Sequence, residues 1–438
     1  MESLWQNFRS ILRRFLPYGV LDSWDDLNPR LYLAVHIYWL KFFGMWYNKH
    51  SPRSPLYWLQ LLYGAVVLFL TCILPTFGEV YYLLQHTDDV GDIAEGLYLF
   101  LSEIYTFFKI SVFWWNKAAI LSLLQYLHCP EFRATEPEHR PALRRRVAAA
   151  RFVMTYYSTM CVGAVSVGII MPMTENFEVL PTNVEYPYID VYRSPIYWIM
   201  YLHHVYYKPA VCIIDGVMDT ILAAFIAAAI GQIEILAFNL QNFDMLAERR
   251  RRRDADAGRG VAAGKGVDAG KGAVARPDDY YVMAVLKDCI KHHNSIISYV
   301  ALIERAFSLA SVLQLMLSAM VLCLVGVQFL SIENPASHPM QIMWMVIYLS
   351  CMLIEVFILC WFGDDLIWKS SSLRQAAFDG PWRRCGRRAA RCVLLLMTRC
   401  QRPLAVTAGK IFPLSLQTYT VLINWSYKAF AVMSNMKT

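Results

Sequence analysis

Residues 369–410 read KSSSLRQAAFDGPWRRCGRRAARCVLLLMTRCQRPLAVTAGK, and an apolar segment at about 412–433 follows directly. The quoted stretch holds ten Lys and Arg residues, whereas the five residues after the apolar segment hold one. Basic residues of membrane proteins collect in the connections on the cytoplasmic side of the bilayer. The stretch therefore predicts a cytoplasmic segment that leads into a final membrane-spanning helix.

Seven apolar segments are each long enough to cross a hydrocarbon core of about 30 Å, which takes roughly 20 helical residues. They cover about 56–77, 93–115, 148–172, 196–236, 306–332, 341–361 and 412–433. The alternating connections between them hold 35 Lys and Arg on one side of the membrane and 2 on the other. We therefore expect an all-α polytopic membrane protein with seven transmembrane helices, a cytoplasmic N-terminus and an extracellular C-terminus. That orientation is the reverse of a G-protein-coupled receptor.

The composition excludes a soluble protein and a secreted disulfide scaffold. The chain is 57% hydrophobic and only 17% charged, as expected of a polytopic membrane protein. Its net charge of +7 lies in the cytoplasmic connections, so it predicts contact with membrane lipids and not with nucleic acid. The eleven cysteines lie in expected spans or reducing cytoplasmic segments, so we expect no disulfide in the outer loops. The charged N-terminus lacks the apolar core of a cleavable signal peptide.

The chain divides into four parts. In order, these are an interfacial cytoplasmic segment (1–54), the first six transmembrane helices (55–361), cytoplasmic helices (362–411), and the seventh helix with the C-terminus (412–438). The first part is rich in Trp and Tyr, which favour head-group depth. A span at 30–47 is the alternative, which its short length and its His and Lys residues oppose.

A low-complexity insert at 249–277 interrupts the second part. It begins with the run Arg249–Arg253 and continues as a Gly/Ala-rich tract, which is typical of a linker. The tract lacks the G-x-x-x-x-G-K-[ST] spacing of a phosphate loop, so we expect no nucleotide site there. The arginines predict contact with the inner leaflet or a determinant of topology, with a trafficking or partner signal as the alternative.

Three strings in the second half of the chain are distinctive. They are LKDCIKHHNSI at 286–296 with IERAFS at 303–308, CWFGDD at 360–365, and RCQRP at 399–403 with AGKIFPLS at 408–415, ending in Leu422-x-x-x-Ser426-Tyr427. Together they resemble the insect odorant receptor family, over most of the chain and most specifically in its C-terminal third. The family's co-receptor has a longer second cytoplasmic loop and a different C-terminal string, so the chain resembles a tuning subunit.

The resemblance implies a ligand-gated, nonselective cation channel in the plasma membrane of olfactory sensory neuron dendrites. Four subunits, tuning chains together with the co-receptor, would surround one pore lined by the last helix of each. Small volatile odorants would be the ligands, and the cytoplasmic helices at 362–411 would form an anchor domain. No enzymatic activity, cofactor or metal is implied, and no Ser/His/Asp, H-E-x-x-H or redox C-x-x-C arrangement is present.

The seventh span is the most polar of the seven. Its polar residues are Gln417, Thr418, Thr420, Asn424, Ser426 and Lys428, followed by Ser434 and Asn435. Polar side chains at membrane depth are costly unless they face protein or water, so this span predicts a pathway or a subunit interface.

Matching the end of the chain with the family pattern places Val432 and Met436 at its hydrophobic gate, with Asn435 beside them. Their i, i+4 spacing puts the pair on one helical face, and such a ring can close a pore by dewetting. Lys428 lies one turn earlier on that face, where four copies would repel cations and one would be tolerated. We therefore expect conduction only from a heteromer. The alternatives are that the gate pair only packs, and that Lys428 snorkels or pairs with a carboxylate.

The family's odorant pocket lies in the outer half of spans two, three, four and six. Matched by depth, its candidates here are Leu97, Phe100, Leu101 and Ile104, then Cys161, Ala164 and Gly168, then Tyr201, His204 and Val205, then Met345, Tyr348 and Leu349. An apolar volatile needs aliphatic and aromatic walls with few polar groups. Ordinary helix packing is the alternative for each of these residues, because both roles use the same side chains.

Several charged and histidine residues remain. The charged residues in or near the spans are Glu103, Lys109, Asp215, Asp219 and Glu355. They predict structural ion pairs or groups that face a cytoplasmic vestibule, with a role in ion permeation as the alternative. The adjacent pairs His203-His204 and His292-His293 each point to two helix faces, which does not favour a metal site.

Two other kinds of protein are alternatives to an odorant receptor. A gustatory receptor of the same superfamily would carry T-Y followed by four apolar residues and Q-F, whereas Asn424-Trp425 stands in place of Q-F here. A secondary transporter would show inverted repeats and helices broken at mid-membrane, which the sequence lacks.

Overall fold

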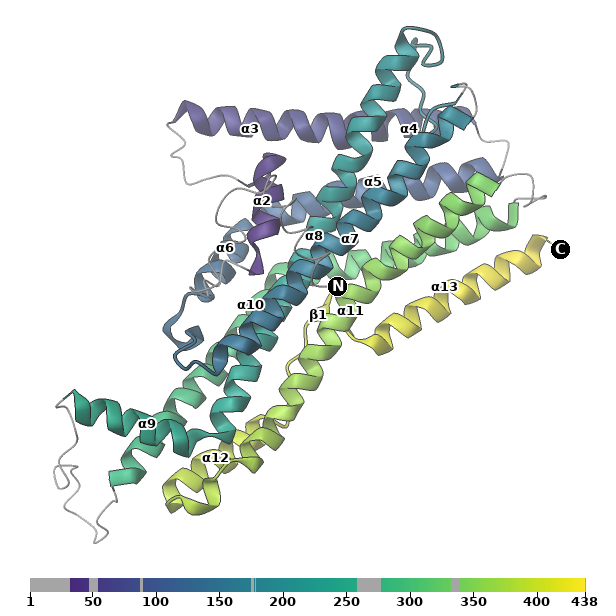
Figure 1. Cartoon of the computed structure of the whole chain (residues 1–438). Helices are drawn as coiled ribbons and strands as arrows, with labels where there is room; N and C mark the ends of the chain where they lie inside the picture. Colours follow the sequence, from purple (N-terminus) through teal and green to yellow (C-terminus); the bar gives the residue numbers. More distant parts are fainter. Residues whose placement is uncertain are drawn as a thin grey trace.

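The computed structural model describes residues 32–46, 54–86, 90–174, 177, 179–257, 277–331 and 339–437, and almost all of them are helical. Figure 1 shows long helices running side by side, with short helices at one end of the molecule. The predicted all-α class is therefore confirmed. Most of the expected N-terminal segment (1–31, 47–53) and of the insert (258–276) lies outside the described residues.

The helices follow one another with short connections. In chain order they are α2 (Ala34–Phe42), α3 (Pro55–Leu68), a π-helical turn (Phe69–Ile73), α4 (Leu74–Gln85), α5 (Val90–Trp115), α6 (Lys117–Tyr126), a 3-10 turn (Pro130–Phe132), α7 (His139–Thr174), α8 (Ile196–Gln241), α9 (Phe243–Asp256), α10 (Pro277–Ser331), α11 (Pro339–Asp379), a 3-10 turn (Trp382–Arg384), α12 (Arg387–Arg399) and α13 (Leu416–Lys437). At nine residues, α2 is too short to span a bilayer, which opposes a span at 30–47.

Six helical segments are long and apolar enough to cross a membrane, and they coincide with the first six expected spans. They are Pro55–Gln85, Gly96–Trp115, His139–Ile170, Ile196–Gln241, Asp279–Phe329 and Ile342–Arg384. The seventh expected span is the helix α13, which is not among those six. Its Gln, Asn, Thr and Lys residues lower its hydropathy, although its 22 residues are long enough to cross.

The first span contains a π-helical turn at Phe69–Ile73, between α3 and α4. Pro75 follows this turn closely. A proline in a helix has no N–H to donate, and its ring collides with the carbonyl four residues earlier, which here is that of Thr71. A widened turn relieves that collision. The hydroxyl of Thr71, which lies in this turn, donates to the carbonyl of Val67 in α3 at 2.7 Å.

The long helix α8 forms the centre of the bundle. From Ile214 to Ile233 nearly every residue is buried, because α8 packs against α7, α10 and α11 as well as α2. Small side chains at Ala223, Ala224 and Ala227–Ala229 let these neighbours approach from several sides. A helix that is apolar on all faces is expected in such a central position.

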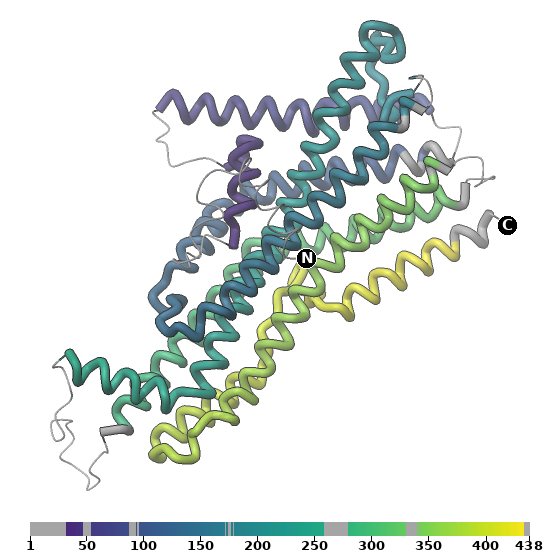
Figure 2. The backbone as a smooth tube through the Cα atoms, in the orientation of Figure 1, coloured from purple at the N-terminus to yellow at the C-terminus, as the bar shows by residue number. Residues whose placement is uncertain are grey.

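Helices α10 and α11 extend beyond the bundle, as continuations of their spans. The part of α10 that precedes its span and the part of α11 that follows its span lie with α9 and α12 at one end of the molecule, at the lower left in Figure 1. The tube in Figure 2 follows α13 from the middle of the molecule along the flank of α10 and α11, with which it makes its contacts. The division of the chain into domains stays a prediction.

A two-stranded hairpin turns the chain into α13. Strand β1 (Thr407–Ala408) pairs antiparallel with β2 (Phe412–Pro413), and the turn between them places Gly409 and Lys410 at φ of +60°. Two residues with positive φ are typical of a type I′ turn, which suits the twist of a hairpin. A Cβ at position 409 would also lie 3.1 Å from Val312, so glycine fits there for two reasons.

The arginine run lies in α9, where each of its five side chains meets a carboxylate. Arg249 contacts Glu138 at 2.7 Å and Glu136 at 3.1 Å, and Arg253 contacts Glu136 at 2.7 Å. The other three pairs are Arg250 with Asp288, and Arg251 and Arg252 with Glu248. The run is therefore paired within the protein, which argues against a free basic patch for lipid.

Replacing Arg249 by alanine is expected to loosen α9 from the segment before α7. The guanidinium of Arg249 hydrogen-bonds Glu138 and lowers the pKa of that carboxyl from 4.5 to about 2. The stabilisation that this ion pair gives to the folded state is present above pH 4.5 and is lost as the pH falls toward 2. Hydrogen exchange at pH 7 should show severalfold faster exchange across α9 in Arg249→Ala.

The matched control for this prediction is Arg252→Ala. Arg252 pairs with Glu248 one turn earlier in the same helix, at 2.8 Å, so it does not hold α9 to another segment. Exposed ion pairs of this kind contribute little to the stability of a protein. Equal exchange in both variants would contradict the docking role of Arg249.

Candidate functional site

A charged cluster lies buried among the spans. The ammonium of Lys109 on α5 contacts Asp219 at 2.5 Å and Asp215 at 2.8 Å, both on α8, and Glu355 on α11 at 3.2 Å. The side chains of Lys109, Asp219 and Glu355 are each at most 5% exposed. The expectation of structural ion pairs is confirmed for these four residues.

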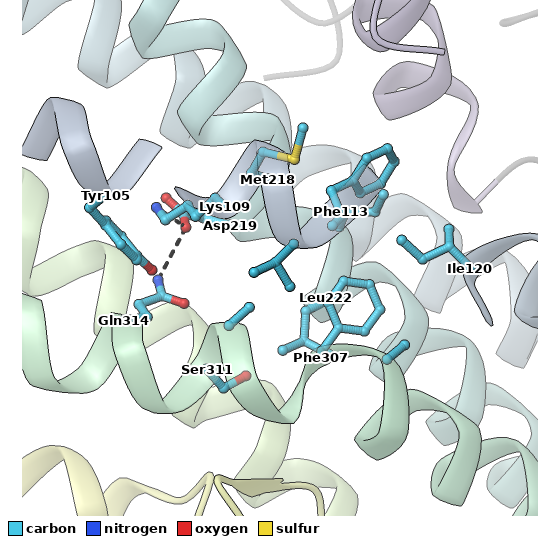
Figure 3. Close-up of a pocket in the computed structure, with 14 residues that line it drawn as sticks. Tyr105, Lys109, Phe113, Ile120, Met218, Asp219, Leu222, Phe307, Ser311 and Gln314 are labelled. Atoms are coloured by element: carbon cyan, nitrogen blue, oxygen red, sulfur yellow. Dashed lines mark hydrogen bonds and ion pairs between the residues drawn. The ribbon is translucent and has the colours of Figure 1, made fainter. Parts of the chain in front are cut away.

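Neutral side chains from two further helices complete the cluster. The amide of Gln314 on α10 donates to Asp219 at 3.1 Å and to Glu355 at 2.8 Å, and Tyr157 on α7 donates to Glu355 at 3.5 Å. Figure 3 shows Lys109 and Asp219 beside Tyr105 and Gln314. The cluster thus links α5, α7, α8, α10 and α11 by polar contacts at one level of the bundle.

A second buried group lies between α4, α5 and α8. Lys208 approaches Glu79 and Glu103 at 3.8 Å each, and the hydroxyl of Thr76 donates to Glu103 at 3.1 Å. Glu79 is 2% exposed. Glu103 therefore also has a structural pair, as expected, and this lysine faces two carboxylates as Lys109 faces three.

Three of the candidate odorant-binding residues come together between α5, α10 and α11. Leu101, Tyr348 and Leu349 pack against buried Tyr98 and Val321. The ring of Tyr348 lies 5.0 Å from that of Tyr98, and its hydroxyl lies 2.6 Å from Ser102 Oγ. This set forms an apolar cluster with one polar pair, the composition expected of a site for volatile ligands.

Two other candidates lie apart from that cluster, against the connection between α7 and α8. Tyr201 donates its hydroxyl to the carbonyl of Ile169 at 3.0 Å, and its ring packs near Tyr197. His204 is 1% exposed, and its Nε2 lies 2.9 Å from Thr182 Oγ1. Both polar groups are already occupied within the protein.

The remaining candidates differ widely in exposure. Ile104 and Val205 are 40% and 38% exposed, so they face outward in the single chain. Buried positions are Cys161, Ala164 and Met345, while Leu97, Phe100 and Gly168 are half-buried. Trp344 on α11 lies beside Gly168 on α7. All thirteen assignments stay predictions, although the structure places them in different surroundings.

Matching by depth missed several members of the apolar cluster. Tyr98 and Val321 are buried at its centre, and Val325 packs one turn further along α10. Tyr98, Ser102 and Tyr105 follow an i, i+4, i+7 pattern on α5, which the sequence displays. The part that α10 plays in the cluster could not be expected from the sequence. The family pattern places the pocket in spans two, three, four and six, whereas α10 contains span five.

Helix α13 carries an exposed stripe with polar members. Gln417, Val421, Asn424, Lys428 and Val432 recur every three or four residues, and all of them are exposed in the single chain. The opposite face holds Leu422 and Ser426, which are buried against α10 and α11. Asn435 and Met436 lie in the last turns of α13, where the structure describes the backbone alone. The gate assignment therefore stays a prediction.

Two cavities are lined by other residues than the thirteen candidates. One of about 30 Å³ lies between α5, α8 and α10, beside the charged cluster. Another of about 470 Å³ lies toward the end of the molecule that holds α9 and has Arg133, Asn239 and Lys291 in its wall. Acidic Asp215, Asp219 and Glu355 lie close enough to hold a metal ion, but the ammonium of Lys109 contacts all three.

Comparison with known proteins assigns the family. A sequence model described as 7tm Odorant receptor matches residues 89–427. Odorant receptor 46a, isoform B, of Drosophila melanogaster is 24% identical over 90% of this chain and 94% of its own length. Odorant receptor Or2 of Anopheles gambiae is 24% identical over 67% of this chain and 71% of its own.

A solved structure has the same fold. It is the olfactory receptor OR5 from Machilis hrabei in complex with eugenol, with a TM-score of 0.74 at 13% sequence identity, covering 93% of this chain and 98% of that one. Three independent observations agree: six apolar spans, a family match over most of the chain, and a shared fold. The chain therefore belongs to the insect odorant receptor family and is a membrane-spanning olfactory receptor, not an enzyme.

Proposed function

We propose that the chain is a tuning subunit of an odorant-gated, nonselective cation channel and that it assembles with the family's co-receptor. It would lie in the plasma membrane of olfactory sensory neurons, with its N-terminus in the cytoplasm. The observation that carries the proposal is the exposed stripe on α13, where Gln417, Asn424 and Lys428 face away from the rest of the chain. Such groups require water or another subunit in a membrane.

The distribution of basic residues supports the orientation. The end of the molecule with α9 and α12 carries the Arg-rich segments, which favour the cytoplasm. The gustatory and transporter alternatives lose their support, because the odorant receptor family model matches most of the chain. Odorants enter as the ligand class because a receptor of the same fold binds eugenol.

Whole-cell recording tests this proposal. The chain expressed with the co-receptor is expected to give odorant-evoked cation current, and the chain expressed alone is expected to give none. A broad odorant panel that includes eugenol provides the stimuli, and a tag reports surface expression. A robust current from the chain alone would contradict the heteromer requirement. Absence of current in both cases, with the protein at the surface, would contradict the channel itself.

We place the odorant site at the cluster formed by Tyr98, Leu101, Tyr348 and Leu349. Tyr348→Ala would remove an aromatic wall and the hydroxyl that pairs with Ser102, at 2.6 Å. Losing such an anchor costs about 1–2 kcal/mol of binding free energy, so the half-maximal odorant concentration should rise about tenfold. Dose–response curves in co-expressing cells measure it.

Two controls accompany this variant. Tyr280→Ala removes an aromatic side chain that is 59% exposed at the start of α10, far from the cluster in the sequence. Tyr348→Phe keeps the ring and removes the hydroxyl alone, so it separates packing from hydrogen bonding. An unchanged dose–response curve in Tyr348→Ala would place the site elsewhere, for instance nearer Tyr201 and His204.

A further inference from the structure

The motif CWFGDD at 360–365 ends in two aspartates that face different helices. Asp365 forms an ion pair with Arg146 on α7, at 2.6 Å. The carboxylate of Asp364 instead accepts the backbone N–H of Leu416, the first residue of α13, at 3.3 Å. These two residues are 52 positions apart in the chain. The motif therefore joins α11 to the start of the seventh span.

The first turn of α13 needs such a partner, because the first N–H groups of a helix have no acceptor within that helix. Ser415, the residue before α13, satisfies one of them, since its hydroxyl oxygen accepts the N–H of Thr418 at 3.3 Å. The N–H of Leu416 has its acceptor on α11. The negative charge of Asp364 also suits the positive end of the α13 helix dipole. The cap of α13 is thus completed by a residue of another helix.

Gly363 lets the two backbones come close enough for this contact. A Cβ at this position would collide with the carbonyl oxygen of Leu414 and would lie 2.7 Å from the Cβ of Leu414, so glycine fits where other residues do not. Leu414 is fully buried, and its N–H donates to the carbonyl of Val406 at 2.9 Å, across the hairpin. The hairpin is also attached to α10, since Gly409 donates its N–H to the carbonyl of Ser308 at 3.0 Å. The entry to α13 is therefore held between α10 and α11.

Further along, α13 packs on α10. The ring of Tyr419 still contacts α11, at 5.6 Å from the ring of Phe357. Two turns later, the hydroxyl of Ser426 donates to the carbonyl of Ala319 on α10, at 3.4 Å. Leu416 and Tyr419, which contact α11, both lie at the N-terminal end of α13. A shift of α11 would consequently act on α13 at that end.

Helix α11 also carries part of the apolar cluster that we propose as the odorant site. Tyr348 belongs to this cluster and lies 16 positions before Asp364, about 24 Å along the helix at 1.5 Å per residue. The helix continues between these residues without a break, from Pro339 to Asp379. One helix therefore connects the proposed ligand site with the cap of α13.

We infer that Gly363 and Asp364 are positioning residues, which attach the first turn of α13 to α11 so that a movement of α11 on odorant binding reaches the last span. The inference rests on the proposed channel function, in which α13 lines the pore. Neither residue belongs to the apolar cluster or to the exposed stripe of α13. A change at this attachment should therefore alter how well a bound odorant opens the channel and should leave odorant binding unchanged.

Odorant dose–response curves in cells that also express the co-receptor test the attachment, with the current divided by the amount of protein at the surface. Asp364→Ala removes the acceptor, and losing a hydrogen bond of the N-cap type shifts a conformational equilibrium about fivefold. The maximal current should fall about fivefold, whereas the half-maximal odorant concentration should stay that of the unmodified chain. Asp364→Asn retains an acceptor oxygen and should keep most of the current. Gly363→Ala should resemble Asp364→Ala, because its methyl group would push Leu414 away.

Asp379→Ala is the matched control. Asp379 is exposed at the end of α11 and accepts a hydrogen bond from Gln375 in the same helix, at 2.7 Å. Its removal should change neither the maximal current nor the half-maximal odorant concentration.

Several outcomes would overturn the inference. These are a full maximal current from Asp364→Ala, equal losses in Asp364→Ala and Asp364→Asn, and a half-maximal odorant concentration that rises as predicted for Tyr348→Ala. If Asp364→Ala and Gly363→Ala both failed to reach the surface while Asp379→Ala did, the attachment would serve folding and not opening. Absence of current from the unmodified chain would instead refute the proposed function, and the inference with it.

Discussion

Lys109→Met is expected to abolish most of the folded protein at the cell surface. Among the residues that the structure describes, the ammonium of Lys109 is the one positive group in contact with Asp215, Asp219 and Glu355, at 2.5–3.2 Å. Removing one partner of a buried ion pair costs about 3–5 kcal/mol, because the remaining charge is left without compensation. That is a large part of the roughly 5–15 kcal/mol that keeps a typical protein folded.

Surface biotinylation and size-exclusion profiles of the detergent-solubilised protein measure this loss. Lys287→Met is the matched control, since Lys287 is exposed on α10 and takes no part in the cluster. Lys109→Met combined with Asp219→Asn and Glu355→Gln should recover part of the yield. The remaining carboxylate, Asp215, has the most exposed side chain of the three, at 20%. Normal yield from Lys109→Met alone would show that the carboxylates do not require the ammonium.

The cluster also shows the limit of sequence reasoning about charges. Residues such as Lys109 and Glu355 could be singled out, because charged groups inside apolar segments are costly and need partners. Their pairing could not be predicted, since Lys109 and Asp215 are 106 positions apart and Lys109 and Glu355 are 246 apart. Only the packing of α5, α8 and α11 brings these side chains to one level.

The helices themselves were easier to predict than their ends. Apolar runs marked the first six spans, because burying each backbone polar group in lipid requires a helix. The apolar run at about 306–332 marked only the second half of α10, which runs from Pro277 to Ser331. Residues 280–305 hold charged side chains and form no apolar run, so the helix before the span had to be inferred separately. Helix α13 was predicted from its length and place, although its polar residues separate it from the other six.

Matching by depth predicts how far along a helix a pocket residue lies, but it does not predict which way the side chain faces. His204 and Val205 are neighbours on α8, yet one is 1% and the other 38% exposed. Each residue turns a helix by about 100°, so matching by depth leaves the facing direction open. Leu101 joins the cluster around Tyr348, whereas Ile104, almost one turn later, is 40% exposed. The direction is decided by which neighbours pack on α5, which one sequence does not record.

Lys428→Gln is expected to raise cation current, and most strongly in assemblies made of this chain alone. Lys428 is exposed on the α13 stripe, and none of the described carboxylates forms an ion pair with it. In a water-filled pore, a unit charge roughly 6 Å from a permeating cation repels it by about 0.7 kcal/mol. Four lysines would raise the free energy of the ion in the pore by about 3 kcal/mol, which lowers its occupancy about 100-fold. One lysine would lower the occupancy about threefold.

Current density per surface-expressed channel, with and without the co-receptor, measures the effect of this substitution. Lys428→Gln should raise the current of the heteromer about threefold and should allow a current from the chain alone. Lys428→Arg retains the charge and should behave as the unmodified chain does. If Gln and Arg at this position give the same heteromer current, then Lys428 does not face the ions. The exposed stripe on α13 would in that case be a contact between subunits, and the restriction to heteromers would need another cause.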